Sequence, residues 1–598
     1  MQLAHRAIAL AATLVIPVFL HAQTYPSKDD PRSKLKPGRL DADTASRNMR
    51  LVSFSPKPAE FDTARGLTFI NSDLAFGDKY VYQGNFSGFV IWDVSDPTKP
   101  KMVSAVSCVT SQGDPSIYGN LLFISAEGGG NRNDCAKGGV KDPKDHMAGV
   151  RIYDVSDPAT PRLVKNVQTC KGSHTHTIVP SRKDKGIIYI YVSGFQGARS
   201  EADLPGCKEG SDPADVTNSL YRLDVIRVPL AAPEKSEVVT GARVFTGIDA
   251  APVAASRSAG RPGASEEFPT GPRNCHDVTA YPAANLLAGA CGSHGLLVDI
   301  SNPEKPVRLD AKADTNFSLW HTAVFSNDGK KVVFTDEWGG GTSPMCQANS
   351  MMEMGGNTIL TIDAKRKYKQ HAYFKINTAQ TAEENCVSHN GGLIPVPGRD
   401  IMVQGWYQGG VSVMEFTDPD HPKELAYFDR GPIDPPPGVD VPVTPSASGS
   451  RGGRYAIGGS WGAYWWNGLI YSSELDRGFD IYELTVSDQI SKNELEAAKL
   501  VRFAQYNPQS QPKIEWPAAF PVVRSYLDQL VRGNGLATAR TTAIAGALDA
   551  AESAQGRARR TALESLARQV DRDVAGAKDP ERVKAMSAAI KNLAEATN

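Results

Sequence analysis

The chain has 598 residues, of which 41% are hydrophobic and 22% are charged, and its formal net charge is −1. This balance is that of an ordinary globular protein, and it argues against nucleic acid or an anionic membrane surface as the partner. The length leaves room for more than one domain.

The N-terminus predicts export from the cytoplasm. A basic pair precedes an apolar run over Ala7–Leu20, and the small Ala22 offers a cleavage point, so residues 1–23 are expected to form a secretory signal peptide. No later stretch has the ~18 consecutive apolar residues that a membrane-spanning helix requires. We therefore expect a periplasmic or secreted protein, in which residues 24–48 form an N-terminal extension.

A short pattern recurs along the next part of the chain. It reads GFVIWDVSDPTKP from Gly88, GVRIYDVSDPATP from Gly149, GLLVDISNPEKP from Gly295 and GVSVMEFTDPDHP from Gly410. Each copy alternates apolar residues and then turns at a proline before a second extended run, which predicts strand, turn, strand. Two further strand-like runs precede most copies. Each unit is therefore expected to be a four-stranded antiparallel propeller blade.

Weaker copies at Asn218–Val228, Asn357–Ala364 and Gly478–Leu484 bring the expected count to seven. The predicted fold class is all-β, with a seven-bladed β-propeller over residues 49–488 and a small helical bundle after it. In the strands FVIWDVSDP, VRIYDVSDP and LLVDISNP the chain resembles the LVIVD-repeat family of secreted and cell-surface bacterial propellers. The resemblance implies this architecture and no particular activity.

The two ends of the ring must also meet, because an open ring exposes a strand edge. The last copy lacks an outer strand, whereas Arg50–Pro56 reads RLVSFSP and is similar to the outer-strand runs PKMVSAV and PRLVKNV. We predict that Met49–Ser55 pairs beside Phe479–Leu484. The competing candidate is Lys499–Tyr506, for which a preceding capping box favours a helix.

Residues 489–598 change to a helical pattern. Ser491 and Glu494 form the capping box, and apolar residues such as Leu563, Leu566 and Val570 recur at helical spacing. We expect a bundle of four or five helices that packs or docks without chemistry of its own.

Four histidines occupy what we interpret as one register, immediately before the innermost strand of four successive blades. They are His176, His276, His321 and His389, and His174 is the alternative to His176. Equivalent positions on inner strands surround the axis of a propeller. Neutral imidazole is the commonest protein ligand for metals, so the pattern indicates a possible site for a divalent metal ion.

Acidic residues approach the same rim. Glu127, Glu337 and Glu474 each end the second strand of a blade, and we include Glu127 and Glu337 in the candidate metal site. Two alternatives stay open. The cluster could bind a polar ligand without a metal, or the histidines could be structural and hydrogen-bond the backbone of the neighbouring blade.

The eight cysteines form an even set in an exported chain, which favours disulfides. Some precede an inner strand and the others lie at or after the end of a second strand, so neighbours are expected to pair. The expected pairs are Cys108–Cys135, Cys170–Cys207, Cys275–Cys291 and Cys346–Cys386. Eight cysteines allow about 105 arrangements, so the connectivity stays open at this point.

Two functions remain. The first is an exported binding or scaffold propeller whose disulfide-pinned loops recognise a protein or glycan partner. The alternative is a metal-dependent enzyme, an oxidoreductase or hydrolase, that uses the histidine ring at the axial mouth. The ring is similar in concept to that of carotenoid-cleaving oxygenases, although no wider motif of that family is present. Because the sequence does not reveal which groups orient the imidazoles, binding is the preferred interpretation.

Overall fold

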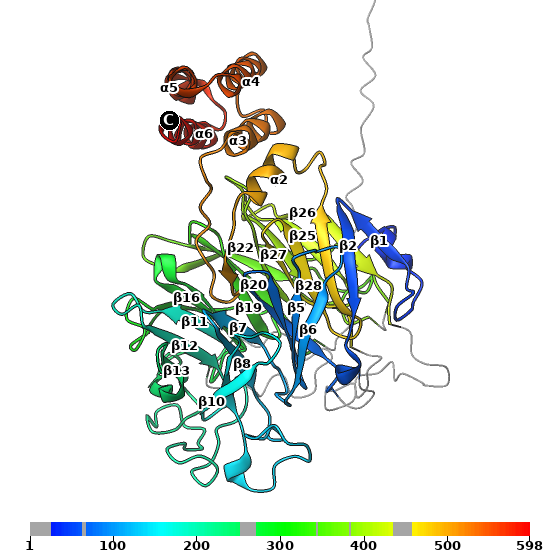
Figure 1. Ribbon diagram of the computed structural model, residues 1–598, viewed down its shortest axis with the longest axis vertical. Helices are drawn as coiled ribbons and strands as arrows, with labels where there is room; N and C mark the ends of the chain where they lie inside the picture. Colours follow the sequence, from blue (N-terminus) through cyan, green and yellow to red (C-terminus); the bar gives the residue numbers. More distant parts are fainter. Residues whose placement is uncertain are drawn as a thin grey trace, which may run out of the picture.

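The computed structural model describes residues 25–62, 67–251, 271–341, 345–381, 384–433 and 457–597. The protein is mostly β, with several four-stranded antiparallel sheets that resemble propeller blades and a short C-terminal helical region (Figure 1). The expected signal peptide lies outside the described residues. Among the helices that are described, none is long and apolar enough to cross a membrane.

Five sheets each contain four consecutive strands that pair antiparallel in chain order. These sets are β3 (Asn71–Gly77), β4 (Tyr80–Asn85), β5 (Gly88–Asp93) and β6 (Lys101–Ser107); β7 (Pro115–Tyr118), β8 (Leu121–Ala126), β9 (Gly149–Asp154) and β10 (Arg162–Gln168); β11 (Thr175–Pro180), β12 (Ile187–Ser193), β13 (Leu223–Pro229) and β14 (Glu237–Ala242); β15 (Asp277–Tyr281), β16 (Leu286–Cys291), β17 (His294–Asp299) and β18 (Val307–Ala313); and β19 (Trp320–Phe325), β20 (Lys331–Asp336), β21 (Asn357–Ile362) and β22 (Tyr368–Phe374).

The remaining sheet has nine strands. In it β23 and β27 pair in parallel and join two four-stranded groups, and β1 adds a ninth strand beside β26. Its order is β1 (Thr44–Arg47), β26 (Lys423–Arg430), β25 (Val411–Glu415), β24 (Ile401–Gly405), β23 (Asn390–Ile394), β27 (Ser460–Trp466), β28 (Leu469–Glu474), β29 (Gly478–Leu484) and β2 (Met49–Pro56). The first strand of each group contacts the first strand of the next, as β3 contacts both β7 and β27. These first strands therefore form the inner wall around a common axis.

The backbone geometry explains why the repeat has a glycine at the start of its third strand and an aspartate at the end. Gly88, Gly149 and Gly478 open third strands with φ near +150°, and a Cβ added at Gly88 would lie 1.8 Å from a carbonyl oxygen of β6. Only glycine fits there without moving the backbone. Asp93 and Asp154 end their strands by accepting hydrogen bonds from the serine two residues later. They are turn acceptors.

The predicted pairing at the closing edge is confirmed. β2 runs antiparallel to β29 from Met49↔Leu484 to Pro56↔Gly478. Met49 and Leu484 also belong to one buried core cluster. The N-terminal strand thus covers the edge that β29 would otherwise expose.

The segment Phe503–Trp516, hereafter the strap, lies against the ends of the inner strands. The indole N–H of Trp466, the last residue of β27, donates to the carbonyl of Phe503, and β30 (Gln505–Tyr506) pairs with β3. Asn507 donates to β7, Ser510 to β11, and Gln511 to β15 and β19. The strap therefore passes round the axis at the end where the inner strands finish.

The C-terminal region contains five described helices. They are α2 (Lys492–Lys499), α3 (Phe520–Arg532), α4 (Thr538–Ser553), α5 (Gly556–Asp573) and α6 (Pro580–Glu595). The capping box of Ser491 and Glu494 is present. Helices α3 to α6 share one apolar core, and Figure 1 shows them on the far side of α2 from the sheets.

Glu494 joins the helices to the sheets. Its carboxylate accepts hydrogen bonds from Arg399, which precedes β24, and from Arg532 at the end of α3. Burial acts to raise the pKa of Glu494, but the hydrogen bond from Arg532 and the charge of Arg399 outweigh it and lower the pKa. The ionised carboxylate is therefore the form that stabilises the folded state, and this stabilisation is lost as the pH falls.

Replacing Glu494 by Ala is expected to lower the free energy of unfolding by about 3–5 kcal/mol at neutral pH, because two arginines lose their buried partner. The matched control is Glu496→Ala in the same helix, where the side chain is exposed and pairs with Lys492. That change is expected to cost less than about 0.5 kcal/mol. Urea unfolding measures both, and equal effects would contradict the expectation.

Candidate functional site

Four imidazoles meet where the inner strands β11, β15, β19 and β23 begin. They belong to His174, His276, His321 and His389. Neighbouring ring centroids along this series are 3.9, 4.1 and 4.0 Å apart. All four side chains are buried. The repeats therefore bring imidazoles from distant parts of the sequence into one cluster.

The fourth member of the cluster is His174, and His176 lies elsewhere. The backbone N–H of His174, like that of His276 and of His389, donates to a carbonyl of the second strand of its own group, at 2.7, 2.8 and 3.1 Å. His176 lies two residues further along β11, where its Nδ1 is 2.8 Å from Ser125 Oγ. Burial lowers the pKa of His176 to about 3. Its position between sheets fits a structural role.

Glu337, which follows β20, lies against the other three rings. One carboxylate oxygen is 3.5 Å from His276 Nε2 and 3.8 Å from His321 Nε2. The second oxygen is 3.8 Å from His389 Nε2 and accepts a hydrogen bond of 2.6 Å from the hydroxyl of Tyr407. In the described part of the chain, Nε2 of His321 and of His389 has no hydrogen-bond partner. Three Nε2 atoms thus face one carboxylate.

The other ring nitrogen, Nδ1, of His276, of His321 and of His389 lies beside a polar group. Asp277 Oδ1 lies 3.0 Å from Nδ1 of His276. Thr335 Oγ1 lies 3.4 Å from Nδ1 of His321. A backbone carbonyl of β27 accepts a hydrogen bond from Nδ1 of His389. Such contacts fix the ring orientation and leave Nε2 directed at Glu337.

These three imidazoles are neutral. Burial lowers the pKa of His276, His321 and His389 well below the ordinary value, and the neighbouring histidines of the cluster act in the same direction. Neutral imidazole is the form that binds metals. The protonation state of the cluster therefore suits a metal ion.

The geometry of the cluster also suits a metal ion. Nitrogen–oxygen separations of 3.5–3.8 Å are long for hydrogen bonds. Ligands held about 2.1 Å from a tetrahedral ion lie roughly 3.4 Å apart, so the separations approach those of a coordination shell. Ligand atoms of His321, Glu337 and His389 all lie within 4.8 Å of one another, as do those of His276, Asp277 and His321.

Glu127 has a different partner. Its Oε2 is 2.7 Å from Nδ1 of His174. Burial acts to lower the pKa of His174, but the charge of Glu127 and this hydrogen bond raise it to about 9. The pairing with Glu127 therefore favours the protonated form of His174. Glu474 lies apart from the cluster and pairs with Arg477.

Three buried aspartates at the starts of inner strands were missed by the sequence interpretation. They are Asp73, Asp114 and Asp277. Burial raises the pKa of Asp73 and of Asp277 to about 7. Asp277 contacts His276 through one oxygen, and its other oxygen accepts a hydrogen bond of 3.2 Å from Gln509 of the strap. The site and the strap are thus joined by hydrogen bonds.

A cavity of about 300 Å³ opens over the cluster, and its lining includes His174, His276, Glu337 and Tyr407. A cavity of about 340 Å³ lies elsewhere, beside the disulfide of Cys170. The second cavity contains no histidine cluster. The axial cavity is therefore the candidate functional site.

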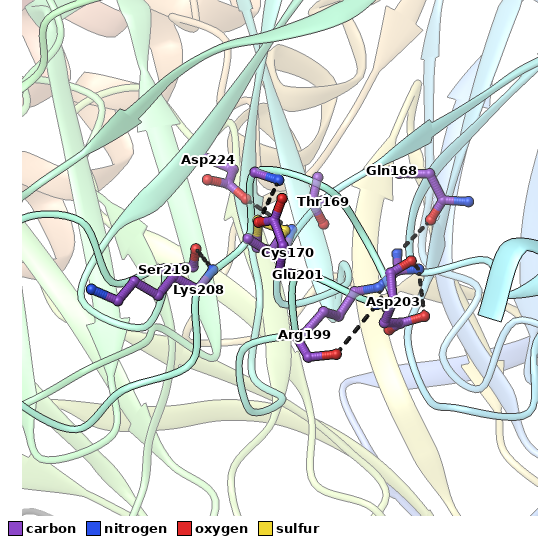
Figure 2. The surroundings of a disulfide bond; sticks show 12 residues. Gln168, Thr169, Cys170, Arg199, Glu201, Asp203, Lys208, Ser219 and Asp224 are labelled. Carbon is purple, nitrogen blue, oxygen red and sulfur yellow. Dashed lines mark hydrogen bonds and ion pairs between the residues drawn. A yellow bond between two sulfur atoms is a disulfide. The ribbon is translucent and has the colours of Figure 1, made fainter.

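All eight cysteines form disulfides, in the four neighbour pairs that the strand positions predict. Figure 2 shows how one of them, Cys170–Cys207, fixes a loop. Arg199 in that loop forms an ion pair of 2.6 Å with Asp203 and donates to Gln168 at the end of β10. The loop is therefore held by a covalent link and by polar contacts.

Replacing both Cys346 and Cys386 by Ser is expected to lower the free energy of unfolding by about 4 kcal/mol, and replacing Cys275 and Cys291 by about 3 kcal/mol. The sequence separations are 40 and 16 residues, and the chain entropy that a link removes from the unfolded state grows with the length of the closed loop. Urea unfolding of both double variants tests this order, and the reverse order would contradict it.

The sequence pattern of the LVIVD repeat matches residues 71–108 and 145–169. No curated protein matches the chain. Among solved structures, the chain is similar to a protein of Lactobacillus plantarum (10% identity, TM-score 0.37, covering 61% of this chain and 85% of that one). It is also similar to the β-propeller domain of Myceliophteria thermophila Cps50 (Swd1), with 8% identity, a TM-score of 0.40 and coverage of 73% and 100%. Hydrazine synthase of Kuenenia stuttgartiensis has 12% identity, a TM-score of 0.36 and coverage of 66% and 89%. The two matched segments contain β3 to β6 and β9 to β10, so the chain carries LVIVD repeats, and the resemblance read from its strands is confirmed.

Proposed function

We propose that the protein is an exported seven-bladed propeller that binds a divalent transition-metal ion at one mouth of its axis. The proposed ligands are His276, His321, His389 and Glu337. The observation that carries the proposal is the arrangement of three neutral imidazoles whose Nε2 atoms face one carboxylate while a neighbour holds each Nδ1.

The count of seven blades rests on how the nine-stranded sheet divides. Its two four-stranded groups are antiparallel throughout, and the strands that join them, β23 and β27, pair in parallel over a short stretch. Separating the groups at that pairing gives seven sets of four strands, with β2 as the outer strand of the last set. The four disulfides support an oxidising compartment and therefore export.

The donor set indicates which ions fit. Three imidazoles and a carboxylate suit zinc, iron, copper, nickel or cobalt better than calcium or magnesium, which prefer oxygen ligands. When bound, such an ion would polarise a ligand oxygen or lower the pKa of a bound water. Asp277 and Tyr407 keep His276 and Glu337 in place, and His174, paired with Glu127, would be a proton donor next to a bound ion.

Metal uptake by the mature protein tests this function. After chelator treatment and dialysis, titration with Co²⁺ is expected to give one equivalent bound, with the visible absorption of a four- or five-coordinate site. The unfolding midpoint is expected to rise with Co²⁺ concentration, because an ion that binds only the folded state stabilises it. Uptake below a tenth of an equivalent with an unchanged midpoint would refute the proposal.

A second candidate function is the binding of a protein or glycan partner by the disulfide-pinned loops. It is favoured by the rigid Cys170–Cys207 loop, which presents charged residues around its link. Partner binding of this kind needs no metal. Capture of the same partner before and after chelator treatment would support the scaffold, whereas dependence on metal would support the axial site.

A further inference from the structure

The axial cavity has two unlike sides. The side formed by the groups of β11, β15 and β19 contributes His174, His276 and Glu337. The groups of β27 and β3, which lie next to each other on another part of the inner wall, contribute an apolar side instead. Its members are Leu67, Ile70, Phe86, Ile457, Trp461 and Leu475. An occupant of the cavity must therefore satisfy a metal-binding side and an apolar side together.

Aromatic rings line much of this space. Phe86 and Trp461 pack edge to face with centroids 5.9 Å apart. Phe195 also lines the cavity, and its ring centroid is 5.5 Å from that of His174 and 5.2 Å from that of His276. Aromatic walls favour flat, ring-containing ligands, because ring pairs gain more than buried area alone provides.

Two polar groups of the lining have no partner. The indole N–H of Trp461 has no acceptor, and Oε1 of Gln112 has no donor, among the residues that the structure describes. Both side chains are more than nine-tenths buried, with exposed fractions of 7% and 8%. Buried donors and acceptors are nearly always satisfied in native proteins, so each of these two groups lacks a partner that a native protein would normally supply.

The volume limits the size of that partner. An engineered apolar cavity of about 150 Å³ holds one benzene molecule, so about 300 Å³ accommodates one or two rings with small substituents. A folded protein or a long glycan could insert no more than a single group. The cavity therefore selects a small molecule.

We propose that this cavity binds a small aromatic molecule of one or two rings that carries an oxygen donor. The ring lies against Phe86 and Trp461, the oxygen accepts the indole N–H, and a second oxygen reaches the metal ion. The metal contact rests on the function proposed above, whereas the contacts with Phe86 and Trp461 do not.

Binding of 4-nitrocatechol to the Co²⁺-loaded protein tests the proposal, because this one-ring probe has two oxygen donors and changes its visible spectrum when it coordinates a metal. We expect one molecule bound per protein, with a shifted spectrum. Phe86→Ala is expected to weaken binding about tenfold at unchanged Co²⁺ content. Trp461→Phe, which keeps the backbone carbonyl that accepts from His389 Nδ1, is expected to weaken binding about tenfold per Co²⁺-loaded protein. Phe54→Ala on β2, which does not line the cavity, is the matched control and should leave binding unchanged.

The outcomes separate this inference from the proposed function. If the protein holds one Co²⁺ but 4-nitrocatechol neither binds nor changes its spectrum, the ligand proposal is overturned and the metal site stands. If the protein binds no metal, 4-nitroanisole, which cannot chelate, tests the apolar side alone by calorimetry. Binding that Phe86→Ala weakens and Phe54→Ala does not then supports the cavity, and absence of binding overturns it. Equal weakening by Phe86→Ala and Phe54→Ala also overturns it.

Discussion

Deleting residues 1–57 is expected to prevent the chain from folding to a soluble monomer. The deletion removes β2, which pairs with β29 from Met49↔Leu484 to Pro56↔Gly478. The edge of β29 would then be exposed together with the apolar side chains that β2 covers, and an exposed apolar edge invites aggregation. Size-exclusion chromatography and thermal unfolding of the refolded chain measure the effect.

A synthetic peptide of residues 44–57 provides the control for this deletion. If the loss comes from the missing strand, the peptide should add itself beside β29 and restore a soluble, cooperatively unfolding complex, because backbone hydrogen bonds are made equally well in trans. A scrambled peptide of the same composition should not. A truncated chain that is monomeric and unfolds at the wild-type midpoint would show that β2 is dispensable.

Replacing His321 by Ala is expected to lower the affinity for Co²⁺ by at least about 100-fold, since even the loss of a group that only orients a ligand costs about 10–100-fold. His321 is the member of the cluster whose Nε2 faces Glu337 and whose ring lies between those of His276 and His389. Its removal leaves two imidazoles and a carboxylate. Competition titration against a chromogenic chelator measures the change.

His176→Ala is the matched control for this substitution. His176 is as buried as His321, but its Nδ1 contacts Ser125 and it lies outside the cluster. We expect its replacement to reduce stability and to leave the Co²⁺ affinity within about twofold, because it removes packing without removing a ligand. Equal losses of affinity in the two variants would indicate general destabilisation, and an unchanged affinity in His321→Ala would exclude this residue as a ligand.

The repeat architecture was predictable because its determinants are local. Gly88 and Asp93 mark the start and the end of a third strand through their own backbone requirements, and the same pair recurs as Gly149 and Asp154 in the next strong copy. The pairing of Met49–Pro56 with β29 was predictable for a related reason, since the last copy lacks the outer strand that the others have. The disulfide pairs follow from the same strand positions.

The site was predictable only in part. His174 and His176 lie two residues apart at the start of β11, so both fit the period of the strand equally well. The hydrogen bond from His174 N–H to a carbonyl of β12 decides between them, and it depends on the register of two strands. One local signal existed, because Ser-His occurs at both His174 and His389. Asp114 was missed because a single carboxylate before a strand resembles any turn residue.

The strap could not be predicted, because it has no periodic pattern of its own. Residues after Lys499 were interpreted as the continuation of a helix, whereas α2 ends at that residue. Its irregular course is determined by polar contacts with separate strands, such as those of Asn507 with β7 and Ser510 with β11. Contacts of this kind exist only once the ring has assembled.

The position of the strap also affects how a ligand can enter and leave the axial cavity. Because the strap lies across the ends of the inner strands opposite the histidines, we expect a ligand to enter and leave the axial cavity through the mouth at the histidines. Helices α2 to α6 lie at the end of the axis where the strap is, so a partner bound to them would leave the mouth at the histidines open. The strap is nevertheless connected to His276, because Gln509 donates to Asp277 and Asp277 contacts Nδ1 of His276. A protease that cuts the strap near Phe503 would therefore be expected both to uncover that end of the axis and to weaken the hydrogen bonds that hold the ring of His276.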